Sequence, residues 1–129
     1  MIQKIEPCLL SGEVLIPASK SDAQRALLAA SLCEGRSEIY NVGSSNDVLA
    51  MLDCIKQIGA TVVENKNSVS IIGVSSFPQK ANFNCGESGL TFRLIAGICC
   101  LSNGIYTLDG YGSLLKRKHD FIDEFGVNK

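Results

Sequence analysis

The chain has 129 residues, of which 46% are hydrophobic and 19% charged, and its formal net charge is −1. The length fits at most one ordinary domain, and the composition predicts a folded core rather than a disordered chain. The near-neutral charge excludes a general nucleic-acid binder, which would carry a basic stripe. The sequence shows neither a long uncharged apolar run nor a signal-peptide pattern, so we expect a cytoplasmic protein.

Six cysteines raise the question of a disulfide scaffold. None of them forms a C-x-x-C pair, and several fall on apolar helical faces. Buried free thiols in a reducing compartment fit this pattern better than disulfides. The six are Cys8, Cys33, Cys54, Cys85, Cys99 and Cys100.

The first half of the chain predicts alternating strands and helices. In chain order, we expect an edge strand at Met1–Glu6, a strand at Gly12–Ile16 and a helix at Ser21–Cys33 that Gly35 ends. A strand at Ser37–Val42 and a cap cluster at Ser44–Asp47 follow, and then a helix from Val48 to Ile58 that Gly59 ends. The last elements of this half are a hairpin of Ala60–Glu64 with Ser68–Ile72, around Asn65–Asn67, and a linker at Ser75–Lys80. Helical spacing predicts which side chains are buried. They are Ala23, Leu27, Leu28, Ala30 and Leu32 in the first helix, and Val48, Met51, Leu52, Ile55 and Ile58 in the second.

The second half repeats the first. Glu87–Gly89 opens a helix that runs to about Leu101, and a strand follows at Ile105–Leu108. A turn at Gly110–Ser113 and a helix at Lys118–Phe125, ended by Gly126, complete the half. Each unit therefore reads strand, helix, strand, helix, strand, strand, which is a whole supersecondary unit. Matching positions lie 67 or 68 residues apart, as with Arg25 and Arg93, Gly43 and Gly110, Ile55 and Ile122, and Gly59 and Gly126.

The second unit is shorter than the first. Two strands follow Gly59, whereas only three residues follow Gly126. A sheet without its last strands would expose edges or apolar helix faces. The repeat therefore leaves two alternatives, that the product is truncated or that something else covers this surface.

The stretch Pro17–Arg25 is a candidate anion site. It lies where a strand is expected to pass into a helix, with Ser19 or Ser21 as the N-cap. A helix N-terminus offers unpaired N–H donors and the positive end of a dipole, which suit an anion. Lys20 and Arg25 add two cations of the kinds that bind phosphate or carboxylate. The alternative is that both are ordinary solvated side chains.

Other positions give weaker signals. The stretch Asn84–Gly89 occupies the equivalent helix start in the second unit, and Ser113–Lys118 is a third basic element that would otherwise be a solvated loop. A single histidine, His119, makes a histidine metal cluster or a Ser-His-Asp triad unlikely. The spacing places Asp47 and Asp53 on one helix as surface residues. Glu87 and Asp109 are acid/base candidates that spacing alone does not select. No nucleotide-binding glycine motif is found.

Four motifs in order resemble the start of the 3-phosphoshikimate 1-carboxyvinyltransferase (EPSP synthase) family. They are Gly12-x-Val14-x-Ile16-Pro17-x-Ser19-Lys20-Ser21-x-x-x-Arg25 with Ala26–Ala30, then Ser45–Val48 with Leu52 and Ile58–Ala60, then Ser88-Gly89 with Arg93, then Ser113-Leu114 with Lys116-Arg117. The resemblance covers almost the whole chain. The sister UDP-N-acetylglucosamine enolpyruvyl transferases rank second, because they have Lys-Asn where this chain has Lys20-Ser21 and use a loop cysteine that this chain lacks.

The resemblance implies an α/β fold of two domains, each built from three βαβαββ units of the inside-out α/β barrel type, incomplete here. Residues 1–12 would form an N-terminal strand of the far domain, and residues 13–129 would form a partial domain, with unit one at about 13–74 and a truncated unit two at about 81–129. The implied reaction joins phosphoenolpyruvate to shikimate 3-phosphate and releases phosphate, in the shikimate pathway of aromatic amino acid and chorismate biosynthesis. It proceeds through a tetrahedral intermediate and needs no metal or organic cofactor.

The resemblance also implies site residues. Lys20 would be catalytic and contact both substrates, Ser21 and Arg25 would hold shikimate 3-phosphate, and Gly89 and Arg117 would bind phosphoenolpyruvate. Two dianionic substrates do need several cations and N–H donors. The chain departs from the pattern at two positions. Many members have Asn at Glu87, where an acid would repel phosphate unless protonated or turned away, and most have Pro at Lys118, which would pre-set the next helix.

We expect residues 1–129 to be inactive alone, since the other acid/base groups and phosphate ligands would lie in a missing C-terminal half. No nucleic-acid or membrane partner is indicated. Two other hypotheses remain, a non-catalytic phosphate-binding domain of the same fold and an assembly fragment without a ligand.

Overall fold

Helices and strands alternate along most of the chain. The computed structural model describes residues 3–118 and residue 120. In chain order, the described elements are α1 (Lys20–Ser31), β1 (Arg36–Tyr40), α2 (Asn46–Ile58), β2 (Thr61–Glu64), β3 (Ser68–Ile72), β4 (Lys80–Asn84), α3 (Gly89–Cys99), β5 (Ile105–Asp109) and the short 3₁₀-helix η1 (Leu114–Lys116).

Local sequence signals explain the limits of α2. The Ser45 hydroxyl accepts a hydrogen bond from the Val48 N–H, so it caps the first turn. Gly59 ends the helix with φ +108°, in the left-handed region that favours glycine. Between these ends, all five predicted apolar positions are buried, together with Cys54. The predicted C-terminal end and buried face of this helix are therefore confirmed, and the helix begins at Asn46, two residues earlier than predicted.

The five strands form two separate sheets. The first has the order β1-β3-β2, with both pairs antiparallel, and its β2–β3 pair is the predicted hairpin around Asn65–Asn67. The second contains β4 and β5, paired in parallel from Lys80 opposite Ile105 to Asn84 opposite Asp109. A parallel pair needs a crossover connection, which α3 supplies. Strand β4 confirms that a strand precedes the second repeated helix. Among the described residues the sheets form no closed barrel, and the fold is mixed α/β.

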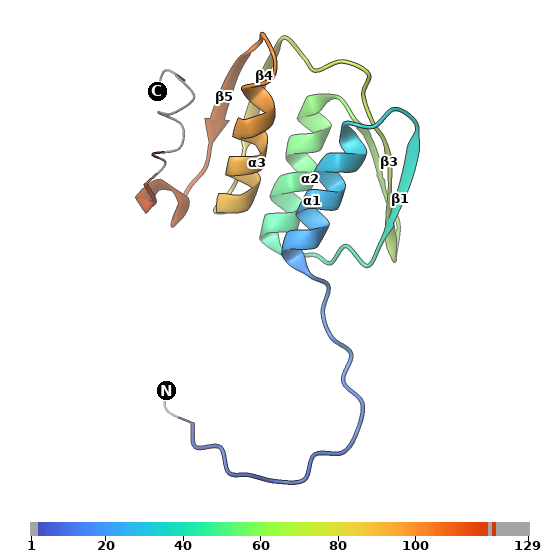
Figure 1. Ribbon diagram of the computed structural model, residues 1–129, viewed down its shortest axis with the longest axis vertical. Helices are drawn as coiled ribbons and strands as arrows, with labels where there is room; N and C mark the ends of the chain where they lie inside the picture. Colours follow the sequence, from blue (N-terminus) through green and yellow to red (C-terminus); the bar gives the residue numbers. More distant parts are fainter. Residues whose placement is uncertain (1–2, 119, 121–129) are drawn as a thin grey trace.

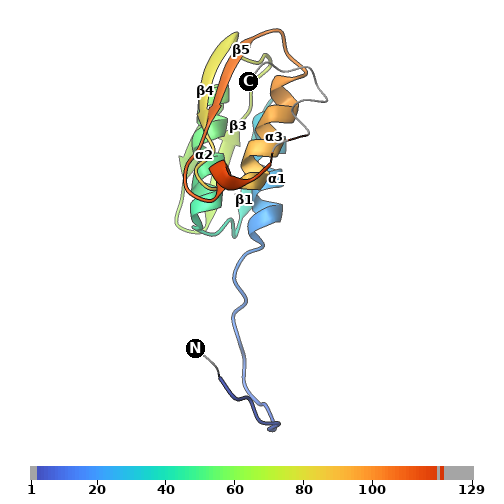
Figure 2. The same cartoon turned by 90° about the vertical axis from the view of Figure 1, so that its left-hand side faces the viewer.

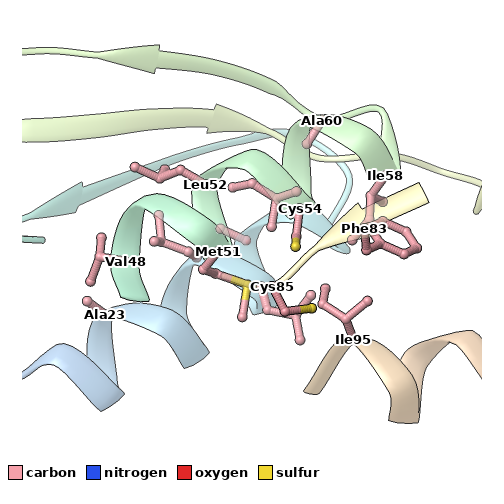
Figure 3. Close-up of a cluster of buried hydrophobic side chains, with 14 of the residues drawn as sticks. Ala23, Val48, Met51, Leu52, Cys54, Ile58, Ala60, Phe83, Cys85 and Ile95 are labelled. Carbon is pink, nitrogen blue, oxygen red and sulfur yellow. The ribbon is translucent and has the colours of Figure 1, made fainter. Parts of the chain in front are cut away.

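One apolar core joins the two sheets. Helix α1 packs against β1, β3 and α2, whereas α2 also contacts β2 and β4. Figure 3 shows Met51 and Cys54 of α2 gathered with Phe83 of β4 and Ile95 of α3. All four side chains are at most 1% exposed. The burial of this shared face fixes the three helices relative to one another.

The helices begin at the same end of the folded body. In Figure 1 the N-terminal turns of α1, α2 and α3 all lie at its lower end. Strand β5 also runs toward this end, and η1 follows it beside the start of α3 (Figures 1 and 2). Three sets of unpaired helix N–H donors are thus placed near one another.

The sequence prediction was wrong at the N-terminus. Residues 3–19 contain no strand, so neither Gly12–Ile16 nor the described part of Met1–Glu6 forms one. Val14, Leu15 and Ile16 are 79–98% exposed, and the segment runs away from the folded body (Figure 1). An apolar pattern produces a strand only where another strand supplies ladder partners. The predicted helix at Lys118–Phe125 and the end at Gly126 lie largely or wholly outside the described residues.

No helix in the described ranges is long and apolar enough to span a bilayer.

Replacing Gly59 and Gly97 with alanine is predicted to change stability in opposite directions. Gly59→Ala forces a Cβ into the left-handed region and should destabilise the fold by about 1 kcal/mol or more. Gly97 lies inside α3, and a Cβ there meets nothing within 4 Å. Gly97→Ala should therefore stabilise the fold by about 0.5–1 kcal/mol. Urea denaturation of both variants measures these changes, and destabilisation by both would show that the α3 backbone is misplaced.

Candidate functional site

A polar pocket of about 350 Å³ lies where the three helices begin. Its walls come from the first turns of α1 and α3, from the start of α2, and from the segment around η1. The lining residues are Lys20, Ser21, Gln24, Asp47, Glu87, Gly89, Leu90, Ser113 and Arg117. The pocket therefore brings together four of the five predicted site residues, all except Arg25.

The N-terminus of α1 has no side-chain cap. Ser19 occupies the predicted N-cap position, but its hydroxyl does not bond the backbone of the first turn. Hydrogen bonds from Ser19 and Arg25 instead hold the pKa of Asp22 below its ordinary value. Lys20 and Ser21 are the first two residues of the helix, and both line the pocket. Their end of the helix keeps N–H donors available to an anion.

Lys20 forms an ion pair across the pocket. Its Nζ lies 2.8 Å from Oδ2 of Asp47, whose side chain is only 26% exposed. Asp47 thus remains at the surface, but the convergence of α1 and α2 partly covers it. Asp53 is 75% exposed, as expected. A bound anion would have to share Lys20 with the Asp47 carboxylate.

The start of α3 approaches Arg117 closely. The Ser88 hydroxyl caps α3 by accepting from the Thr91 N–H, 3.2 Å away. Gly89 follows as the first residue, and a Cβ on it would collide with Nη1 of Arg117. Glycine at this position therefore allows the guanidinium to lie against the helix N-terminus. Gly89 and Arg117 are 28 positions apart in the sequence, and the pairing of β4 with β5 brings them together.

Glu87 orients the segment that carries Arg117. Its carboxylate accepts a hydrogen bond from the Ser113 N–H at 3.2 Å, and the Ser113 hydroxyl accepts from Nη2 of Arg117 at 3.3 Å. A side-chain and a backbone hydrogen bond from Ser113 hold the pKa of Glu87 below its ordinary value, and Arg117 adds to this effect. The carboxyl is thus ionised near neutral pH. The carboxylate therefore bonds Ser113 while Glu87 lines the same pocket as Arg117.

The remaining candidates lie apart from this pocket. Arg25 pairs with Asp22 on the exposed side of α1. Asp109 is exposed, and its Oδ1 accepts from the Gly110 N–H at 2.7 Å, so it supports a turn. Lys118 is exposed, and His119 lies outside the described residues. Within the described ranges no three His, Cys, Asp or Glu side chains gather as metal ligands would.

Two buried thiols lie behind the pocket. Cys54 and Cys85 are fully buried, and hydrogen bonding with Cys85, followed by burial, raises the pKa of the Cys54 thiol. A thiol with a raised pKa, such as that of Cys54, is a poor nucleophile. The two thiols contribute to packing rather than to chemistry in the pocket.

Sequence reasoning missed two residues of the pocket besides Asp47. Gln24 was passed over because nothing in spacing selects a glutamine, although its place beside Ala23 and Leu27 put it on the buried face of α1. Ser113 was noted as the start of a basic element and as part of the fourth motif, but it received no role in the site. A polar side chain on an apolar helical face was the available signal for Gln24.

Comparisons with known proteins agree on one family. The sequence model described as EPSP synthase (3-phosphoshikimate 1-carboxyvinyltransferase) matches residues 5–119. A 3-phosphoshikimate 1-carboxyvinyltransferase of Clostridium beijerinckii is 36% identical over 96% of this chain and 31% of its own length. One from Clostridium kluyveri is 39% identical over 88% of this chain and 27% of its length. The EPSP synthase structure from Acinetobacter baumannii matches with a TM-score of 0.72 and 26% identity, over 88% of this chain and 27% of that one. The chain thus spans less than a third of the length of these relatives.

The ionised Glu87 predicts an acid-dependent loss of stability. Because folding lowers its pKa below the ordinary value of 4.5, its contribution is present above that pH and is lost as the pH falls through the lowered pKa. In Glu87→Gln this part of the pH dependence should disappear. Urea denaturation between pH 7 and pH 3 measures it, with Glu34→Gln, at an exposed residue, as the control. If both variants lose stability with acid as steeply as the parent chain, the Glu87–Ser113 contact is absent in solution.

Proposed function

The chain belongs to the EPSP synthase family, and on this premise we propose that it forms the N-terminal, phosphate-binding part of an enzyme that transfers the enolpyruvyl group of phosphoenolpyruvate to shikimate 3-phosphate. One observation carries the proposal. Lys20, Gly89 and Arg117 come from three separate segments and line one pocket at the helix N-termini. The 3-phosphoshikimate names of the relatives support shikimate 3-phosphate, rather than a UDP-sugar, as the acceptor.

Each of the five predicted site residues has a role in this proposal, and all but Arg25 line the pocket. Lys20 lies between the two substrates and contacts both, as the catalytic cation. Ser21 and Arg25 hold shikimate 3-phosphate. For this, Arg25 releases Asp22 and pairs with the phosphate instead. Gly89 contributes its backbone N–H, and Arg117 its guanidinium, to phosphoenolpyruvate. Donors fixed in place before the reaction stabilise developing negative charge without reorganising.

Proton transfer in this reaction requires groups beyond this pocket. The enol carbon must gain a proton, yet the lowered pKa of Glu87 makes its carboxyl a poor donor near neutral pH. Its negative charge instead keeps Ser113 and Arg117 in place. We propose that the acid/base groups and the opposite wall come from the C-terminal part of the whole protein. When that part closes over the pocket, it would exclude water and strengthen each electrostatic interaction with the substrates.

The division of the chain supports a two-domain enzyme. We propose that residues 1–12 belong to the far domain and residues 13–129 to the near one. The exposure of Leu9 and Leu10, at 90% or more, supports a partner for this segment elsewhere in the whole protein. All six cysteines are free, which supports the cytoplasm as the site of action.

Removing a pocket cation should greatly lower turnover. The test uses a chimera in which residues 1–118 replace the matching segment of the Clostridium beijerinckii relative. Lys20→Ala and Arg117→Ala each remove a charged partner of a phosphate in a dry site, a loss of about 2–5 kcal/mol, which is orders of magnitude in rate. Lys118→Ala, at an exposed neighbour outside the pocket, is the matched control and should retain most activity. Phosphate release measures turnover, and near-normal kinetics of the Arg117 variant would refute its role.

The 129-residue chain alone should bind phosphate-bearing ligands weakly and show no transfer. Asp47 and Glu87 offset the charges of Lys20 and Arg117, and the open pocket is hydrated. We therefore expect a dissociation constant of about 1 mM or weaker for shikimate 3-phosphate. Titration into isotope-labelled chain should shift amides at Ser19–Arg25 and Gly86–Gly89. Unchanged spectra at high ligand concentration would contradict binding, and turnover by the chain alone would contradict the need for a second wall.

A further inference from the structure

Gln24 is a fully buried polar residue among the apolar residues of α1. Its exposed fraction is 0%, the same as that of its neighbour Leu27. Burying an amide is unfavourable unless hydrogen bonds replace those it made with water. The residue also lines the polar pocket, at its inner wall. The hydrogen-bond partners of this amide therefore determine what the residue does in the fold.

The amide nitrogen of Gln24 reaches two other helices. Its Nε2 lies 2.7 Å from the hydroxyl oxygen of Ser88 and 2.7 Å from that of Thr91, both at the start of α3. It also lies 3.2 Å from the backbone carbonyl oxygen of Asp47, in the first turn of α2. The amide has two N–H groups and three nearby oxygens, so at least one N–H is shared between two of these oxygens. One side chain of α1 therefore joins the N-terminal turns of α2 and α3.

The partners of Gln24 are the residues that place the charges of the pocket. Ser88 caps α3 and directly precedes Gly89, against which Arg117 lies. The Asp47 carboxylate holds Lys20. A shift of either helix end would thus change the distance between Lys20 and Arg117. Gln24 itself carries no charge and needs no contact with a ligand to exert this effect.

The other end of the amide shows that this arrangement has a cost. Oε1 of Gln24 is buried and has no hydrogen-bond donor among the described residues. Turning the amide over would direct this oxygen at the Asp47 carbonyl, which is also an acceptor, so the contact with Asp47 requires the observed orientation. An unsatisfied buried acceptor destabilises the fold. Such a cost at this position is better explained by function than by stability alone.

We propose that Gln24 is a positioning residue, which holds the N-terminal turns of α2 and α3 at the spacing that lets Lys20 and Arg117 face one phosphate-bearing ligand. The part of this inference that concerns the ligand rests on the proposed function. The spacing of the helix ends does not, and it is measured separately below. The competing account is that Gln24 only adds stability, like other buried hydrogen-bonding residues.

The test compares Gln24→Leu with a matched control in the 129-residue chain. Leucine keeps most of the volume and removes every hydrogen bond of the amide. The control is Ser31→Ala, which removes another fully buried polar group of α1, a hydroxyl that donates to the Leu28 carbonyl at 2.7 Å. Ser31 does not line the pocket. Both variants are therefore expected to lower stability, but only one is expected to disturb the helix ends.

Two readouts separate positioning from stability. The first is amide exchange at Thr91, whose N–H bonds the Ser88 hydroxyl. We expect it to rise about tenfold in Gln24→Leu, beyond the change in global unfolding, and to follow global unfolding in Ser31→Ala. The second is the affinity for inorganic phosphate, which we expect to fall about fivefold or more in Gln24→Leu and to stay unchanged in Ser31→Ala.

Each outcome decides between the accounts. Equal behaviour of the two variants in both readouts would overturn the proposal. If the parent chain binds no phosphate, the proposed function fails, and the exchange at Thr91 still decides whether Gln24 positions α3. If Gln24→Leu does not fold, Thr91→Val replaces it, because this variant removes one acceptor of the same amide. Its phosphate affinity should then fall while Ser31→Ala keeps that of the parent chain, and equal affinities would again overturn the proposal.

Discussion

Three helix N-termini meet at one end of this fold, and their mutual repulsion is the constraint that the site depends on. Each carries partial positive charge and unpaired N–H groups, so bringing three together is unfavourable without compensation. The hydroxyl caps of Ser45 and Ser88 and the carboxylates of Asp47 and Glu87 provide this compensation. Of the three described α-helices, α1 alone lacks a side-chain cap, and its first residues line the pocket. The same convergence that needs compensation creates a place for an anion.

The apolar core imposes this convergence. Helix α2 contacts strands of both sheets, and its buried face is apolar from Val48 to Ile58. Burial of that face and of Leu27 on α1 fixes the helix directions, so the ends cannot separate without exposing core side chains. The favourable energy of the core therefore offsets the electrostatic cost of the site. Substrate-binding sites commonly combine a rigid scaffold with such locally unfavourable groups.

Elements with strong local signals were predictable from the sequence. The limits of α2 follow from a serine cap, a regular apolar face and Gly59, all encoded within a few residues. The β2–β3 hairpin likewise follows from two short apolar runs around Asn65–Asn67. The strand expected at Gly12–Ile16 was wrong, because an apolar run cannot show whether a partner strand lies beside it. The internal repeat predicted a strand before the second helix, but the pairing of this strand, β4, with β5 was not predicted.

The candidate site was predictable in its charges but not in its connections. Lys20, Gly89 and Arg117 were selected from motifs, and the pocket brings them together. The contact of Asp47 with Lys20 was not predicted, because helical spacing places Asp47 on an outer face and only the approach of α1 brings Lys20 to it. The links through Gln24 join residues 64 and 67 positions apart, a separation at which no local pattern operates. Long-range polar contacts of this kind require the three-dimensional fold.

The central claim is that one pocket at the helix ends receives a tetrahedral anion, and anomalous diffraction tests it most directly. Crystals of the 129-residue chain grown with selenate, a tetrahedral oxyanion like phosphate that contains a heavy atom, would locate the bound anion without assumptions about activity. The account predicts a selenium peak within hydrogen-bonding distance of Lys20 Nζ, the Gly89 N–H and the Arg117 guanidinium. Selenium peaks only elsewhere, with Lys20 still paired to Asp47, would contradict it.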